Sequence, residues 1–334
     1  MAQLYDERIA LARAVDTAGF HCYHVAEHHC TPLGLAPSPN VLLAALARET
    51  RRIRLGPLVS LLPLYEPLRL INEIAMLDHL SHGRLELGVG KGVSPYELRY
   101  HGIDPAAADD IFNETLDTLR AAWAAERLTA GGTHTQRYDD VPLPLRPLQR
   151  PHPPLWCPTS NPDKAESAAR SGMHVVGLGP VERFLACAQR FRAASAGRSS
   201  TAMLGMMRQI VVAPSDDEAL ALVRTVHPRF AANFTALWEA HGNTRPRAVV
   251  DLDAALEHGT VIAGASATVH AELARQANAA DLNYFALAFA WGGLTFEQSR
   301  RSLQLFARGI LPALPDTKRL TPHTTPTAIA PTPV

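Results

Sequence analysis

Three consecutive ionisable side chains, Glu27, His28 and His29, follow a short apolar run, Cys22–Ala26. An amphipathic segment ending at Gly19 precedes that run, so the order is helix, glycine stop, strand and polar exit. In parallel α/β proteins, ligands bind at the carboxyl ends of strands. Imidazole titrates near neutral pH, so it can transfer protons at such a position. The alternative for these residues alone is a polar loop without a chemical role.

A second segment with chemical potential is Leu77–Gly92. It reads as a helix end, a Ser-His-Gly turn, a strand, and a glycine-rich exit that lets the backbone approach a flat or anionic ligand. Lys91 adds positive charge at the end of this strand, in a chain whose only other lysines are Lys164 and Lys318. The alternative is a tightly packed turn with a lysine on the surface.

Composition narrows the class of protein. The 334 residues are 47% hydrophobic and 19% charged, with 32 basic and 32 acidic residues, so a substantial core is expected and no basic field exists for nucleic acid. No apolar stretch reaches the roughly 20 residues of a membrane helix, and the N-terminus does not resemble a signal peptide. The four cysteines show no disulfide or Cys-x-x-Cys spacing, which favours a cytoplasmic protein.

Several other chemistries are disfavoured by missing motifs. The histidines do not form His-x-x-x-His or another metal-like spacing, so no metal site is expected. A Gly-x-Ser-x-Gly elbow is missing, which argues against an esterase. The glycines of Gly88–Gly92 have the wrong spacing for a dinucleotide fingerprint, which argues against a doubly wound open sheet.

Helix-period segments alternate with short apolar runs, which predicts a parallel sheet with crossover helices. Eight βα units in a TIM-like (β/α)8 barrel would explain the pattern if the first strand were missing, because the chain begins directly with a helix. Either the protein is shortened at this end or its coding sequence begins further upstream. The predicted helices are Leu4–Ala18, Ser38–Arg48, Pro67–Leu80, Ala108–Ala125, Pro162–Ser171, Pro180–Ala194, Ala267–Ala279 and Thr295–Arg308. The predicted strands are Cys22–Ala26, Ile53–Val59, Leu85–Val89, Leu155–Pro158, His174–Leu178, Met206–Val212 and Asn283–Phe289.

Two segments interrupt the alternation within a single predicted domain, residues 1–314. Residues 130–154 are rich in Pro, Gly and Arg and are expected to form a loop insertion. Residues 215–264 are expected to carry one or two additional helices as a second insertion. The Thr- and Pro-rich tail, 315–334, lacks apolar periodicity and is expected to be disordered.

The chain as a whole resembles the bacterial luciferase-like family of flavin-dependent monooxygenases and reductases. The resemblance extends to about Pro312, and its most specific parts are Val25–His29 and Leu77–Gly92. Further matching segments are Ser38-Pro39, Leu42–Ala47, Arg52–Gly56, Leu61–Leu64, Pro67, Arg150–Trp156, Phe289–Gly293 and Leu303–Phe306.

The resemblance implies a barrel that holds reduced flavin mononucleotide (FMN), or in one branch the deazaflavin coenzyme F420, at its C-terminal face. It implies that His28 lies beside the flavin ring and acts as a base or proton donor, with Glu27 and His29 orienting it or packing behind it. Strand alternation places Glu27 and His28 on opposite sides, so both are not expected to face the flavin equally.

The resemblance also assigns the cofactor-binding residues. Lys91, where most relatives have arginine, would contact the phosphate after the exit at Gly90. The turn Thr159-Ser160-Asn161 resembles a second phosphate-binding turn at a helix N-terminus, although a plain helix cap is the alternative for Ser160. Leu58-Val59 corresponds to the place where relatives often have a non-proline cis peptide against the flavin.

Three functions remain open at this point. The first is an FMN-dependent monooxygenase that receives reduced flavin from a separate reductase and uses O₂ to oxidise a small organic molecule. The second is a deazaflavin-dependent hydride-transfer enzyme, and the third is a flavin-binding protein without turnover, suggested by the missing strand. Homodimerisation through the helices Ser38–Arg48 and Pro67–Leu80 is the family's habit and is expected here.

Overall fold

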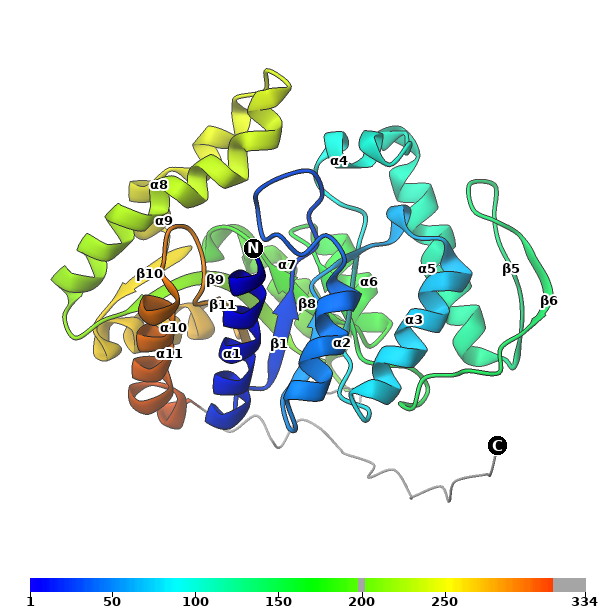
Figure 1. Cartoon of the computed structure of the whole chain (residues 1–334), viewed down its shortest axis with the longest axis horizontal. Coiled ribbons are helices and arrows are strands. Elements are labelled where there is room, and N and C mark those ends of the chain that lie inside the picture. Colours follow the sequence, from blue (N-terminus) through cyan, green and yellow to red (C-terminus); the bar gives the residue numbers. More distant parts are fainter. Residues whose placement is uncertain (198–201, 315–334) are drawn as a thin grey trace.

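Short parallel strands and outer helices alternate along the chain, as the sequence predicts (Figure 1). The computed structural model describes residues 1–197 and 202–314, so the predicted tail at 315–334 lies outside the described residues. The helices are α1 Ala2–Ala18, α2 Pro39–Glu49, α3 Pro67–Leu80, α4 Pro95–Tyr100, α5 Ala108–Ala124, α6 Pro162–Arg170, α7 Val181–Ser195, α8 Asp216–Ala240, α9 Leu252–Glu257, α10 Ser266–Ala280 and α11 Phe296–Gly309. The strands are β1 Cys22–Val25, β2 Arg54–Pro57, β3 Ser60–Leu61, β4 Leu87–Gly90, β5 Arg127–Ala130, β6 Tyr138–Pro142, β7 Leu155–Pro158, β8 His174–Gly177, β9 Leu204–Val212, β10 Val261–Gly264 and β11 Tyr284–Ala288.

The parallel strands form the wall of a barrel in chain order. Strand β1 pairs with β2, and β2 meets the segment before β4 through a parallel bridge between Leu55 and Leu85. Strand β4 pairs with β7, β7 with β8, β8 with β9, and β9 with β11, all in parallel. This order places the carboxyl ends of β1, β2, β4 and β7 beside one another on one face.

The wall has a seam between β1 and β11. Within residues 1–197 and 202–314, β1 pairs only with β2, and β11 pairs only with β9. All residues of β11 are partly exposed, as are the first three residues of β1, whereas β2 and β8 are fully buried. The missing first strand that the sequence predicts therefore corresponds to an unpaired edge on each side of this seam.

Side chains connect the two edges of the seam. The Nε2 atom of His24 on β1 lies 2.9 Å from the hydroxyl of Tyr284 on β11. The rings of Phe20 and Phe289 pack edge to face, with 6.0 Å between their centroids. Side-chain contacts of a polar and an aromatic kind therefore connect β1 and β11 where backbone hydrogen bonds do not.

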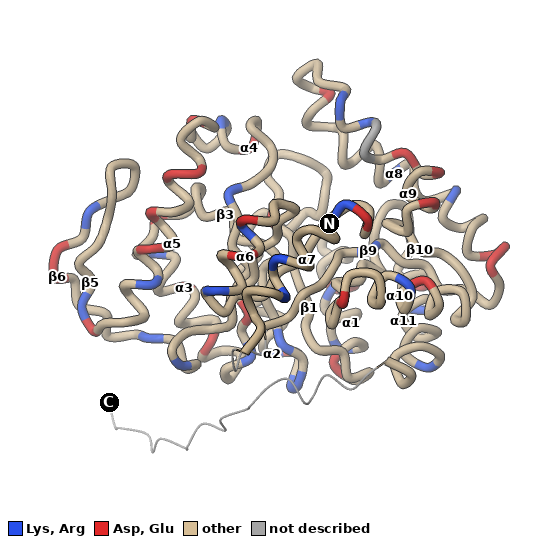
Figure 2. Tube along the Cα trace, turned by 180° about the vertical axis from the view of Figure 1, so that it is seen from behind, with Lys and Arg blue, Asp and Glu red and all other residues tan. Residues whose placement is uncertain are grey.

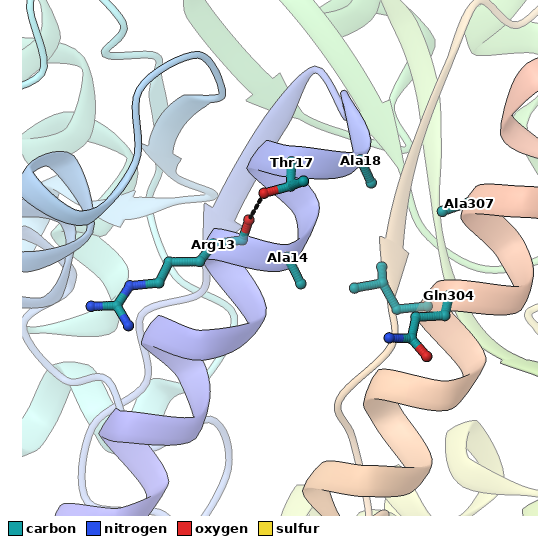
Figure 3. A pocket seen from close by; sticks show the side chains of 7 residues that line it. Arg13, Ala14, Thr17, Ala18, Gln304 and Ala307 are labelled. Carbon is teal, nitrogen blue, oxygen red and sulfur yellow. Dashed lines mark hydrogen bonds between the residues drawn. The ribbon is translucent and has the colours of Figure 1, made fainter.

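A shallow groove runs along the outside of the molecule between α1 and α11, the helices that flank the two edge strands. Arg13, Ala14, Thr17 and Ala18 line one side, and Leu303, Gln304 and Ala307 line the other (Figure 3). Its volume is about 430 Å³, and small alanine side chains leave much of that space. None of its lining residues is a predicted site residue, so this groove is separate from the candidate site.

Both predicted insertions contain regular structure that the sequence pattern did not reveal. Strands β5 and β6 form an antiparallel hairpin that partly occupies the predicted loop at 130–154. The second insertion, 215–264, contains the expected extra helices α8 and α9, but it ends in β10, which pairs with β9. In Figure 1, α8 and the β5–β6 hairpin extend from opposite sides of the barrel.

Charge is evenly distributed over this fold. Basic and acidic residues alternate along the trace, which agrees with the balanced composition (Figure 2). No helix within residues 1–197 and 202–314 is long and apolar enough to cross a membrane.

Replacing Tyr284 with Phe removes the hydroxyl that bonds His24 across the seam. We expect the free energy of unfolding to fall by about 1 kcal/mol, because one partly buried hydrogen bond is lost without a change in ring packing. Urea denaturation measures this change. Tyr23→Phe on β1 is the matched control, because its hydroxyl has no described partner, and an equal loss in both variants would contradict the bridging role of Tyr284.

Candidate active site

Glu27 is buried at the end of β1, with 3% of its surface exposed. One carboxylate oxygen accepts hydrogen bonds from the Leu61 backbone N–H, at 3.0 Å, and from the Tyr65 hydroxyl, at 2.9 Å. The other oxygen lies 2.8 Å from Nε2 of His29. Burial raises the pKa of Tyr65, and the adjacent Glu27 carboxylate raises it further. Glu27 therefore bonds His29 and the segment Leu61–Tyr65, and it has no described contact with His28.

His28 points the other way, as strand alternation predicts, and 27% of its side chain is exposed. Its Nδ1 atom lies 3.3 Å from a carboxylate oxygen of Glu97 on α4. The same Glu97 oxygen accepts the backbone N–H of His29 at 3.3 Å. The described side-chain contact of His28 is therefore with Glu97, and the expectation that Glu27 and His29 orient His28 or pack behind it stays a prediction.

His29 is enclosed by its neighbours. Besides Glu27, its ring packs edge to face against His101, with centroids 4.5 Å apart. Burial lowers the pKa of His101, and the nearby His29 lowers it further. Of the three predicted catalytic residues, His28 is the most exposed, with 27% of its side chain accessible against 14% for His29 and 1% for Glu27.

The segment after β2 lies against β4. The Leu58-Val59 peptide bond is cis, at the place where the resemblance led us to expect one. A Cβ atom on Gly90 would come within 2.7 Å of Val59, and one on Gly88 within 2.5 Å of the Pro57 carbonyl oxygen. The two glycines are therefore required for this close approach, and Leu58 and Val59 remain partly exposed.

Lys91 follows Gly90 and is 45% exposed. Its ammonium group pairs with Asp109 at the start of α5, and the other oxygen of Asp109 lies 3.4 Å from Nζ of Lys164 on α6. The two lysines hold the pKa of Asp109 below its usual value, chiefly through the hydrogen bond from Lys91. Two ammonium groups and one carboxylate leave a net positive charge at this end of the site.

The turn after β7 is occupied by local hydrogen bonds. The Asn161 side chain caps α6 by accepting the N–H groups of Asp163 and Lys164, and the Thr159 hydroxyl accepts the Asn161 N–H. Ser160 between them is exposed. The predicted phosphate-binding side chains of Thr159 and Asn161 therefore act as turn and cap residues, which leaves Ser160 and the neighbouring Lys164 facing solvent.

These predicted residues are connected by a continuous set of contacts. Glu27 bonds Leu61, Leu61 pairs with Gly90, Lys91 pairs with Asp109, and Asp109 pairs with Lys164 next to the Asn161 cap. Sequence reasoning missed Glu97, Tyr65 and Lys164. Only Lys164 carried a signal, namely the rarity of lysine in this chain and its place three residues after Asn161. Among the residues with described positions, no group of three or more potential ligands could hold a metal ion.

A polar cluster fills the barrel interior. The Glu86 carboxylate accepts hydrogen bonds from Arg54 and from the indole of Trp156. Burial favours a raised pKa for Glu86, but His21 and Arg54 together hold it below its usual range. His174 accepts the Met203 N–H through Nδ1 at 2.8 Å, which requires an unprotonated Nδ1. Burial lowers the pKa of His174 to about 4.

Replacing Glu27 with Gln removes the negative charge. It also turns one of the two acceptor oxygens, which now face Leu61, Tyr65 and His29, into an amide donor. We expect a loss of about 2 kcal/mol in the free energy of unfolding, because a buried donor loses its acceptor. Chemical denaturation measures it, with Glu49→Gln as control, since the Glu49 side chain is 40% exposed and pairs with Arg13 at the surface. Equal stability of the two variants would contradict the anchoring role of Glu27.

His174 predicts a pH dependence of stability. Its pKa in the folded protein, about 4, lies below the ordinary 6.5, so between these values the unfolded chain binds more protons. The free energy of unfolding should therefore fall as the pH drops from 6.5 to 4. Below pH 4, the contribution of His174 should no longer change with pH. Over this pH window, the free energy of unfolding should fall by up to about 3 kcal/mol less in His174→Asn than in the unchanged protein. The control His258→Asn, at an exposed position, should show the same fall as the unchanged protein. Parallel slopes for all three proteins would rule out this contribution.

The chain is similar to several known proteins. An uncharacterised protein of Sinorhizobium fredii, y4wF, is 41% identical over 90% of this chain and 89% of that protein. The oxygenase component of a flavin-dependent trigonelline monooxygenase from Acinetobacter baylyi is 33% identical over 52% of this chain and 48% of that protein. The crystal structure of monooxygenase RslO1 from Streptomyces bottropensis superposes with a TM-score of 0.84, at 28% identity, over 93% of this chain and 94% of that chain. The sequence model of the luciferase-like monooxygenases matches residues 2–283, and this chain belongs to that family.

Proposed function

We propose that this protein is the oxygenase of a two-component flavin system, which uses reduced FMN and O₂ to oxidise a small organic substrate. The observation that carries the proposal is the continuous set of contacts that links the loop bearing His28 to the two lysines around Asp109. A cofactor with a flat ring and a phosphate needs an open backbone surface at one end and cationic groups at the other. The relatives named as monooxygenases support the reaction class.

The residues present fit FMN. Gly90 and the cis Leu58-Val59 segment offer backbone and small apolar surface for the ring, and Lys91 and Lys164 offer charge for the phosphate. When bound, reduced flavin would supply the electrons that activate O₂. A separate flavin reductase would deliver it; the similarity to the oxygenase component of the trigonelline monooxygenase supports this arrangement.

The role of this chain's own residues is to bind, orient and transfer protons. His28 presents one ring edge to the site while its Nδ1 faces Glu97, so Nε2 can take a proton from substrate or return one. Glu27 and His29 would keep the His28 loop in place. The α8 insertion lies over this side of the molecule, where Thr31 contacts the Asn233 carbonyl oxygen, and would shape the substrate pocket.

Two further features of the proposal concern assembly and location. Val41 on α2 and Met76 on α3 are 73% and 54% exposed, which is unusual for large apolar side chains and supports a homodimer through these helices. The free cysteines support a cytoplasmic protein.

A binding and turnover experiment tests the cofactor and the reaction together. We expect FMN to bind and coenzyme F420 to bind at least ten times more weakly, and Lys91→Ala to weaken FMN binding about tenfold through the lost phosphate contact. Arg120→Ala, on the outer surface of α5, is the control and should bind FMN normally. Fluorescence titration gives these affinities.

His28→Asn should bind FMN within about twofold of the unchanged protein but lose 10²- to 10⁴-fold in substrate-dependent oxygen consumption, the usual contribution of a proton-transfer group. Aldehydes, ketones and aromatic compounds form the substrate screen. Tight F420 binding without FMN binding would favour the deazaflavin alternative. Flavin binding without oxygen consumption for any substrate would favour a non-catalytic protein.

A further inference from the structure

Glu97 is a buried carboxylate that sequence patterns do not single out. It lies on the short helix α4, and only 4% of its side chain is exposed. Its described side-chain contacts are Nδ1 of His28 and the backbone N–H of His29, each 3.3 Å from the same oxygen. Burying a carboxylate costs free energy unless its partners compensate for the lost hydration. The position of Glu97 beside His28 therefore suggests a role in the candidate site.

The two contacts have different consequences. The His29 N–H fixes the carboxylate, because a backbone donor cannot rotate away. The carboxylate then faces Nδ1 of His28, which favours the ring form that carries its proton on Nδ1 and leaves Nε2 free as an acceptor. Glu27 cannot do this, because Leu61, Tyr65 and His29 already occupy its two oxygens.

The surroundings of Glu97 are also titratable. His28 and His29 face it from the loop after β1, and Glu27 lies beyond His29. His101, just after α4, is close enough for Glu97 to raise its pKa, against the larger lowering effects of burial and His29. His28 is the only one of these groups that combines contact with Glu97 and an exposed ring edge, so the effect of Glu97 on proton transfer would act through His28.

Two tyrosines of α4, next to Glu97 on the helix surface, contact the end of α8. The Tyr96 ring stacks on His241 with centroids 4.1 Å apart and planes 3° apart, and the Tyr100 hydroxyl lies 2.8 Å from Nε2 of His241. Ser94 caps the N-terminus of α4. The helix that carries Glu97 is therefore held by its N-cap and by the end of α8, which restrains the carboxylate relative to the His28 loop.

We propose that Glu97 is a positioning residue that holds His28 in the Nδ1–H form and stabilises its protonated form during the reaction. This rests on the proposed role of His28 in proton transfer. The charge of Glu97 would matter for the protonated ring, and its acceptor oxygen would matter for the choice between the two neutral ring forms.

Two substitutions separate these effects. Glu97→Gln keeps an acceptor oxygen and removes the charge, whereas Glu97→Leu removes both at similar volume. In the flavin-free protein, ¹⁵N shifts of the histidine rings, assigned with His28→Asn, report which ring nitrogen carries the proton. We expect the Nδ1–H form in the unchanged protein and in Glu97→Gln, and a shift to the Nε2–H form in Glu97→Leu.

Turnover gives the second readout. Glu97→Gln should move the acidic limb of the pH–rate profile to lower pH and lower kcat about tenfold, with FMN binding unchanged. Glu49→Gln, at a surface ion pair with Arg13, serves as the control and should leave the profile in place. An unchanged ring form in Glu97→Leu, or a loss of kcat in Glu97→Gln with an unmoved pH profile, would overturn the proposal.

The two proposals can fail separately. If His28→Asn retains full turnover, the proposed proton-transfer role of His28 is wrong, while the ring-form measurement still decides whether Glu97 positions it. If Glu97→Leu does not fold, Glu97→Gln and the conservative Glu97→Asp still report the charge effect. Glu97→Asp should restore the wild-type pH profile in part, and failure to do so with normal folding would count against the proposal.

Discussion

The carboxylate of Glu27 is the constraint on which the candidate site depends. A buried charge is stable in a protein only when hydrogen bonds and opposite charges compensate for its lost hydration. Glu27 obtains this from three residues at once, Leu61, Tyr65 and His29. The loop after β1 is therefore fixed to the segment that follows the cis Leu58-Val59 peptide, and His28, on the opposite side of the chain, is directed out of the core. The acid of the Glu-His-His motif thus has a structural task, which leaves His28 for the proton transfer that we propose.

The seam between β1 and β11 raises the question of whether the site can be intact beside an unpaired edge. The predicted site residues come from the ends of β1, β2, β4 and β7, which are consecutive and connected by backbone pairing or a bridge. The seam lies on the other edge of β1, where His24 and Tyr284 connect the walls. The site is therefore built on an unbroken part of the wall, and the exposed edge affects its stability more directly than its geometry.

The sequence predicted the alternation of helices and strands and the seam, because these follow from periodicity and from the helix at the start. It did not predict β10 or the β5–β6 hairpin, which lie in or beside the two segments whose interrupted apolar pattern was interpreted as loop insertions and which depend on tertiary pairing. The sequence also did not predict which side chains contact each other in the candidate site. The Glu97 contact joins residues 69 positions apart, and neither residue type nor spacing encodes such a pair.

The three-residue group Lys91, Asp109 and Lys164 shows why a surface ion pair and an anion site can be the same feature. Two nearby ammonium groups repel each other, so Asp109 between them reduces that repulsion while no other anion is near. All three side chains are about half exposed, and such pairs contribute roughly 1 kcal/mol or less to stability. A dianionic phosphate binds two ammonium groups more strongly than a single carboxylate does, because it carries twice the charge and more acceptor oxygens. Asp109 therefore keeps two of the chain's three lysines close together near the end of β4, and the flavin phosphate that we propose would compete with its carboxylate for the two ammonium groups.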